Sequence, residues 1–157
     1  KQYNPNIKTQ IEMIDVNKNA PFYASESITI NAETQLVWEK LADIDNWPKW
    51  LTIVKKAKLN GPFKAETTFE WLAGGMPIKS TLHTVIPFFQ IGWTGKVLGL
   101  YAVHNWVFTD LNGKTTVTVS ESMEGFLLKI FKKYLNNSLY KDMLLSLELL
   151  KNACEKH

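Results

Sequence analysis

The pattern of apolar residues changes abruptly near Glu124. Between about residue 51 and this point, apolar and polar side chains tend to alternate, which is the period of β-strands. After it, apolar residues recur every three or four positions, as on an α-helix with one apolar face. They are Leu127, Ile130, Phe131, Tyr134, Leu135, Leu139, Met143, Leu147, Leu150 and Cys154. Strands followed by one long helix predict an α+β fold in which the helix covers an antiparallel sheet.

Turn signals divide the strand region into short segments. They are Asn60-Gly61-Pro62, Ala73-Gly74-Gly75, Pro87 and Asn112-Gly113. Together with strands predicted over residues 23–31 and 51–59, they indicate an antiparallel meander of about seven strands. A helix over residues 125–153 would be about 43 Å long at ~1.5 Å per residue. This is longer than a small sheet requires, so a bend is expected near Asn136-Asn137.

Three of the six tryptophans fall within residues 37–50. Trp38 shares a helical face with Leu41, whereas Trp47 and Trp50 flank Pro48. Proline suits the first turn of a helix but not its interior. Two short helices are therefore expected here, one ending near Asp43 and the other starting near Pro48.

This stretch resembles the polyketide cyclase/dehydrase branch of the START-like superfamily, also called SRPBCC or pollen-allergen-like. Members commonly read Ala-Pro, an alternating strand, then Val-Trp, Leu, Asp-Ile and Trp-Pro-x-Trp; here Ala20-Pro21, residues 26–31 and residues 37–50 match that order. The resemblance implies a helix-grip fold, in which a curved sheet wraps around a long C-terminal helix. It runs from about Asn19 to the C-terminus, so we expect an N-terminal leader or arm over residues 1–19 and a single START-like domain over residues 20–157.

Charge and composition argue against several classes of partner. The net charge is +3, and all 18 basic residues are lysine. Because arginine is the usual residue for bidentate contacts to guanine and phosphate, specific nucleic-acid recognition is not expected. No apolar run reaches the ~18–20 residues of a transmembrane segment.

The chemistry-bearing residues indicate neither a metal nor a cofactor. Cys154 is the only cysteine, and the three histidines are scattered along the chain without ligand spacing. No phosphate-binding or dinucleotide-binding glycine motif is present. A single cysteine is compatible with a reducing compartment, so a cytoplasmic location is expected. The sequence leaves open whether the protein is a monomer or a dimer.

The last hairpin brings a histidine and a glutamate together. A two-residue turn at Asn112-Gly113 pairs residue 111 with residue 114 and places His104 opposite Glu121. The same face of this hairpin, which we expect to point toward the long helix, carries His104, Trp106, Phe108, Val117, Val119, Glu121 and Met123.

Three interpretations of this pair are open. His104 and Glu121 could satisfy each other's hydrogen-bonding needs in the core. They could bind a hydroxyl or carbonyl group of a ligand. Alternatively, Glu121 could orient His104 and raise its pKa, making it a general acid or base. Many relatives carry a histidine and a glutamate at similar places, but the family has no uniform catalytic set. Catalytic residues therefore remain unknown, with His104 and Glu121 as candidates.

A curved sheet and one helix leave an apolar cavity unless large side chains fill it. The residues expected to line such a cavity and bind a ligand are Phe69, Trp71, Met76, Trp93, His104, Trp106, Phe108, Glu121 and Met123. The aromatic members could instead pack directly on the helix.

The expected function is binding of a small hydrophobic molecule, namely a lipid, a polyketide-like compound or an aromatic compound. One alternative is a cyclase or dehydratase acting on such a ligand. Another is a protein-interaction module with a filled core and an exposed apolar patch.

Overall fold

Within residues 13–155, which the computed structural model describes, seven antiparallel strands form one curved sheet. They are β1 (Phe22–Ile30), β2 (Val54–Leu59), β3 (Thr68–Ala73), β4 (Met76–Ile86), β5 (Gln90–Val97), β6 (Leu100–Asp110) and β7 (Thr115–Glu124). The spatial order is β1-β7-β6-β5-β4-β3-β2, so consecutive strands from β2 to β7 are neighbours and β1 pairs with β7. This is the antiparallel meander that the turn signals predict.

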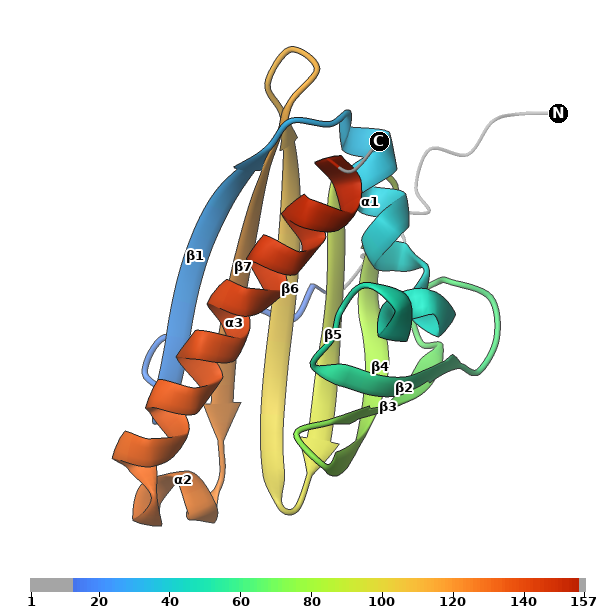
Figure 1. The fold of residues 1–157 in the computed structure, drawn as a ribbon. Coiled ribbons are helices and arrows are strands. Elements are labelled where there is room, and N and C mark those ends of the chain that lie inside the picture. Colours follow the sequence, from blue (N-terminus) through green and yellow to red (C-terminus); the bar gives the residue numbers. More distant parts are fainter. Residues whose placement is uncertain (1–12, 156–157) are drawn as a thin grey trace, which may run out of the picture.

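The C-terminal helix α3 (Lys132–Glu155) lies across the concave side of the sheet (Figure 1). Helix α1 (Thr34–Ala42) and the 3-10 helix η1 (Ile44–Lys49) connect β1 to β2 on the same side of the sheet, where α1 lies beside the C-terminal end of α3. The arrangement is the helix-grip fold, and it confirms the α+β class, the long C-terminal helix and the short helices after the first strand.

The main core forms where α3, α1 and η1 meet the sheet. From α3, the buried side chains of Met143, Leu147, Leu150 and Cys154 join it. From η1, Trp47 is 1% exposed, and its indole N–H donates a hydrogen bond to the carbonyl oxygen of Leu41 at 2.8 Å. A buried indole N–H usually finds such a partner, and this bond joins η1 to the end of α1.

The C-terminal helix is interrupted at Phe131, not near Asn136-Asn137 as the sequence suggests. A short helix α2 (Phe126–Ile130) comes first, and Phe131 then leaves the helical region with φ −109° and ψ 29°. The break lets Leu128, which the apolar stripe omits, reach a second buried cluster with Phe22, Leu100, Ala102 and Met123. It also leaves Ile130, Phe131 and Tyr134 exposed instead of packed on the sheet.

Among the described residues, no helix combines the length and the apolar character that crossing a bilayer requires.

The connection between α1 and β2 also differs from expectation. The second short helix begins at Ile44, and Pro48 lies inside it. The strand expected from residue 51 begins only at Val54, because the backbone N–H groups of Leu51 and Val54 donate to the carbonyls of Trp47 and Leu51 in successive turns. These turns let Trp47 enter the core.

Residues 13–19 lie on the outer face of the sheet. The side-chain amide of Asn105 donates to the carbonyl of Ile14 at 2.9 Å, and the backbone N–H of Asn17 donates to the Ser122 hydroxyl at 2.9 Å. Both strand residues point away from α3, and this segment explains why they are nevertheless buried. Residues 1–12 of the expected leader lie outside the described residues.

The position of α3 predicts that shortening a side chain on its buried face will strongly lower the free energy of unfolding. Leu150 is fully buried, so Leu150→Ala should lower the free energy of unfolding by about 2–5 kcal/mol. Leu145→Ala is the matched control, because Leu145 is 41% exposed and should change stability by no more than about 0.5 kcal/mol. Urea denaturation measures both variants. Equal effects would contradict this placement of the helix.

Candidate functional site

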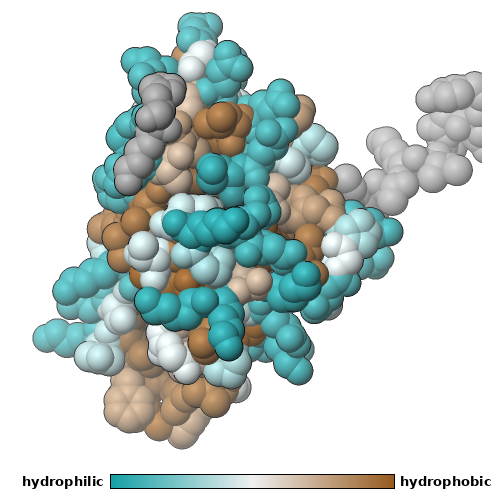
Figure 2. Space-filling view, turned by 45° about the vertical axis from the view of Figure 1, so that its right-hand side comes forward, coloured by the Kyte–Doolittle hydropathy of each residue, from teal (hydrophilic) through white to brown (hydrophobic). Residues whose placement is uncertain are grey.

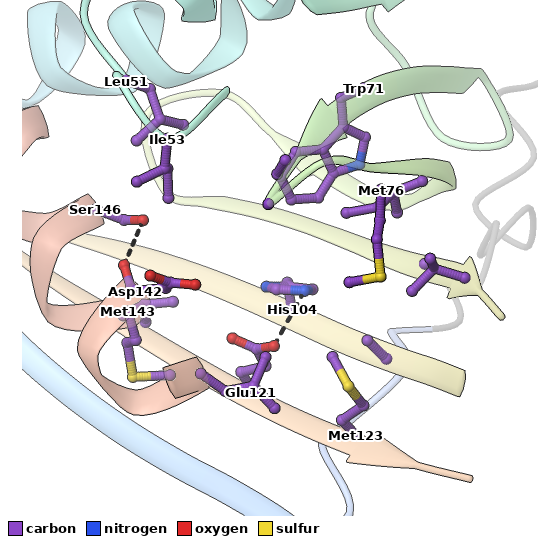
Figure 3. A pocket seen from close by; sticks show the side chains of 18 of the residues that line it. Leu51, Ile53, Trp71, Met76, His104, Glu121, Met123, Asp142, Met143 and Ser146 are labelled. Atoms are coloured by element: carbon purple, nitrogen blue, oxygen red, sulfur yellow. Dashed lines mark hydrogen bonds and ion pairs between the residues drawn. The ribbon is translucent and has the colours of Figure 1, made fainter. Parts of the chain in front are cut away.

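A cavity of about 370 Å³ lies between the concave face of the sheet and α3. Its wall is mostly apolar, and Figure 3 shows it from close by. Strands β3 to β7, the segment around η1 and the first half of α3 all contribute side chains. The cavity is therefore enclosed by parts of the chain that lie far apart in the sequence.

Aromatic rings form one end of the cavity wall. Trp71, Trp93 and Trp106 come from β3, β5 and β6, and Trp47 and Trp50 come from the segment around η1. The ring centroid of Trp47 lies 5.6 Å from those of Trp71 and Trp93. Aromatic rings at this spacing and in offset or edge contact stabilise one another. The rings at this side of the cavity therefore support one another by direct contact.

His104 and Glu121 face each other in the cavity wall, as the hairpin register predicts. Their backbones are directly paired across β6 and β7, and His104 Nε2 lies 3.5 Å from Glu121 Oε1. The His104 ring also stacks on Trp93, with centroids 5.2 Å apart and an interplanar angle of 18°. The side chains are only 15% and 8% exposed. The imidazole is thus held by a strand partner on one side and an indole on the other.

Burial determines the charge of this pair. It lowers the pKa of His104 from 6.5 to about 4, because the imidazolium would lose its hydration. Burial, with a smaller contribution from the nearby Asp142, raises the pKa of Glu121 from 4.5 to about 8. The interpretation in which Glu121 raises the pKa of His104 is therefore not supported, because burial shifts this pKa downward. At neutral pH the His104 imidazole is therefore uncharged, and Glu121 keeps its carboxyl proton. Of the two residues, Glu121 has the pKa nearer to neutrality.

Helix α3 supplies polar residues that the apolar stripe did not reveal. Ser138, Asp142 and Ser146 line the cavity at a spacing of four residues, which places them on one side of the helix. The hydroxyl of Ser146 donates to the backbone carbonyl of Asp142 at 2.8 Å. Burial raises the pKa of Asp142, although its side chain remains partly exposed. The four-residue spacing of these polar side chains is the sequence feature that could have identified them as lining the cavity.

Most of the expected ligand-binding residues do line the cavity. These are Trp71, Met76, Trp93, His104, Trp106, Glu121 and Met123. Phe69 and Phe108 do not, because both are fully buried in the main core. Phe69 packs edge-on against Trp47, with ring centroids 5.6 Å apart. Alternation along a strand predicted the correct face for both, but not that α1 and η1 cover this end of the sheet.

Among residues 13–155, no group of three or more histidine, cysteine or acidic side chains is arranged to hold a metal ion. The polar side chains among the described residues that line the cavity are one imidazole, two carboxyl groups, the hydroxyls of Tyr134, Ser138 and Ser146, and the indole N–H groups. Such a set can exchange protons and hydrogen-bond to neutral oxygen atoms. It offers no lysine to neutralise an anion.

The fold and the cavity define the class as a helix-grip protein with an internal apolar site. A family model described as "Polyketide cyclase / dehydrase and lipid transport" matches residues 22–155. The chain belongs to this family, and the match confirms the branch that its tryptophan-rich stretch resembles. No curated protein sequence matches the chain.

Solved structures share the fold at low sequence identity. A hypothetical protein, jhp0584 from Helicobacter pylori, superposes with a TM-score of 0.79 at 16% identity, covering 91% of this chain and 98% of that one. The Zhui aromatase/cyclase from Streptomyces sp. R1128 superposes with a TM-score of 0.76 at 13% identity, covering 85% of this chain and 93% of that one. A START superfamily protein from Mycobacterium smegmatis gives 0.69 at 13% identity, covering 85% and 97%.

The raised pKa of Glu121 predicts a particular dependence of stability on pH. The unfolded chain releases this proton near pH 4.5 and the folded chain near pH 8, so the folded state binds the proton more tightly. Its contribution to stability is present below pH 4.5 and is lost as the pH rises through 8. Between these pH values the free energy of unfolding of the wild-type protein should therefore fall by at least about 1 kcal/mol more than that of Glu121→Gln. This difference is equivalent to roughly one pKa unit. Urea titrations at a series of pH values measure it, and parallel profiles would show that Glu121 is not buried in its acid form.

Proposed function

We propose that the protein binds one small hydrophobic molecule carrying a neutral oxygen-containing group. The observation that carries this proposal is an apolar cavity with the His104–Glu121 pair in its wall. Its volume of about 370 Å³ falls within the usual range of small-molecule sites. Burial of apolar ligand surface would supply most of the affinity, and the polar pair would set the orientation.

The geometry of the pair supports a role in recognition. A distance of 3.5 Å is at the long limit for a hydrogen bond, so neither side chain is well satisfied by the other. Protonated Glu121 can donate a hydrogen bond and neutral His104 can accept one. A ligand hydroxyl placed between them would use both capacities, and a ligand carbonyl would accept the hydrogen bond from Glu121.

The second carboxyl group restricts the ligand further. Asp142 lies close enough to Glu121 to raise its pKa, so negative charge is already unfavourable here. Among the described residues, a ligand carboxylate against this wall would meet two carboxyl groups and no lysine. A hydroxyl, ketone or phenol is therefore favoured over a fatty-acid headgroup.

The family supports the same class of ligand. Its description couples polyketide cyclases and dehydrases with lipid transport, and one similar structure is an aromatase/cyclase. Polyketides and lipids are largely apolar and carry neutral oxygens. The open cavity speaks against the alternative of an interaction module with a filled core. A cytoplasmic location stays a prediction.

Catalysis is the second candidate function. Glu121, with a pKa of about 8 and its side chain in the cavity wall, has the properties of a general acid at neutral pH. Dehydration or enolisation requires proton transfer to or from a carbonyl or hydroxyl, which this pair is placed to contact. A binder would return its ligand unchanged, whereas an enzyme would return a compound of altered structure.

Blocking the cavity tests the proposal. Ser138 lines the cavity and its side chain is itself exposed, so Ser138→Trp should obstruct the cavity without disturbing the core. The neighbouring Asn137 is exposed and does not line the cavity, which makes Asn137→Trp the matched control. With the neutral dye Nile red, Ser138→Trp should weaken binding by about tenfold or more, equivalent to about 1.4 kcal/mol. Asn137→Trp should bind as the wild type does.

Fluorescence titration gives the affinities, and circular dichroism confirms that both variants are folded. Equal binding by the two folded variants would show that the dye enters elsewhere and would contradict the proposed site.

A further inference from the structure

The most exposed large apolar side chains gather at one end of the molecule. Leu98, Phe126, Ile130, Phe131 and Tyr134 are between 54% and 77% exposed, more than any other large apolar residue among those described. We call these five residues the α2 patch. Figure 2 shows hydrophobic residues gathered at this lower end, where Figure 1 places α2 and the turn between β5 and β6. Scattered exposed apolar residues are common, but a contiguous group marks an interaction surface.

The exposure follows from how α2 is anchored. Gly125, just before α2, has φ 144°, and a Cβ there would lie 2.7 Å from the carbonyl oxygen of Gly99. Only glycine permits this close approach, which holds α2 against the β5–β6 turn that carries Leu98. Leu128 alone of this helix is buried in the core. Leu127 is partly buried against the same cluster, whereas Phe126 and Ile130 are directed outward.

Positive charge surrounds these apolar side chains. Residues 125–141 contain Lys129, Lys132, Lys133 and Lys141 and no aspartate or glutamate. The first three lysines are exposed and alternate with the apolar residues of the patch. Exposed phenylalanine, isoleucine and tyrosine mixed with lysine is the composition of segments that lie in the interface of an anionic bilayer.

The patch is also next to the cavity. Tyr134 belongs to both, and Val97 and Leu100, on either side of the β5–β6 turn, line the cavity as well. A surface that receives this end of the molecule would therefore lie beside the cavity wall.

We propose that the α2 patch docks on the surface of a lipid bilayer that contains anionic lipids. Apolar side chains would enter the boundary between headgroups and acyl chains, and the lysines would contact lipid phosphates. A second copy of the chain is a poorer occupant, because a two-fold interface would bring the same lysines of both copies together. This docking goes beyond the proposed ligand binding and does not depend on it.

Vesicle co-sedimentation of the full chain tests the docking. The protein should bind vesicles of phosphatidylcholine mixed with phosphatidylglycerol, more weakly at high salt, and should bind pure phosphatidylcholine less well. Two double variants, Phe126→Ser with Phe131→Ser and Lys129→Glu with Lys132→Glu, should each lower the affinity by about tenfold or more.

Matched controls change exposed residues away from the patch. Phe89→Ser with Leu111→Ser removes apolar side chains that are 51% and 49% exposed, and Lys55→Glu with Lys56→Glu reverses two exposed charges. Both controls should bind as the wild type does, and Nile red binding should be retained in all four variants. Absence of vesicle binding, or equal losses in patch and control variants, would overturn the proposal. So would sedimentation showing that the patch instead joins two copies of the chain.

Discussion

A single helix does not fill the concave face of a seven-stranded sheet, and the site depends on that mismatch. At one end, α1 and η1 complete the core with Trp47, Phe69 and the buried residues of α3. At the other end, Leu128 closes a smaller cluster. Between them the sheet and the first half of α3 remain apart, and a cavity of about 370 Å³ persists. The break at Phe131 belongs to the same geometry, because it lets α2 reach the second cluster while α3 crosses the sheet.

The low polarity of this space gives its few polar groups their properties. His104 and Glu121 are paired by strand register, but burial rather than their mutual attraction fixes their protonation, lowering one pKa to about 4 and raising the other to about 8. Asp142 adds a second carboxyl from α3. Under the proposed function, such a wall would favour neutral, oxygen-bearing ligands. The lysines of residues 125–141 lie instead around the α2 patch, so the molecule separates a neutral interior site from a basic outer surface.

The sequence predicted most of the fold because its local signals agree with one another. The two-residue turn at Asn112-Gly113 determined the register that pairs His104 with Glu121. Alternation identified inward faces, but it could not say which end of the sheet the short helices cover, and so Phe69 and Phe108 were placed in the cavity instead of the core. Asp142 was missed because the helical pattern was read from apolar residues alone. The direction of the pKa shift of His104 required its burial, which no sequence pattern gives.

The most direct test of the open cavity is native mass spectrometry of the full chain, purified without detergent and then extracted under denaturing conditions. We expect one small apolar molecule for each chain, or, if the protein is isolated empty, uptake of one equivalent of Nile red. A protein that carries nothing and takes up no dye would contradict it, because the space between the sheet and α3 would then be closed in solution.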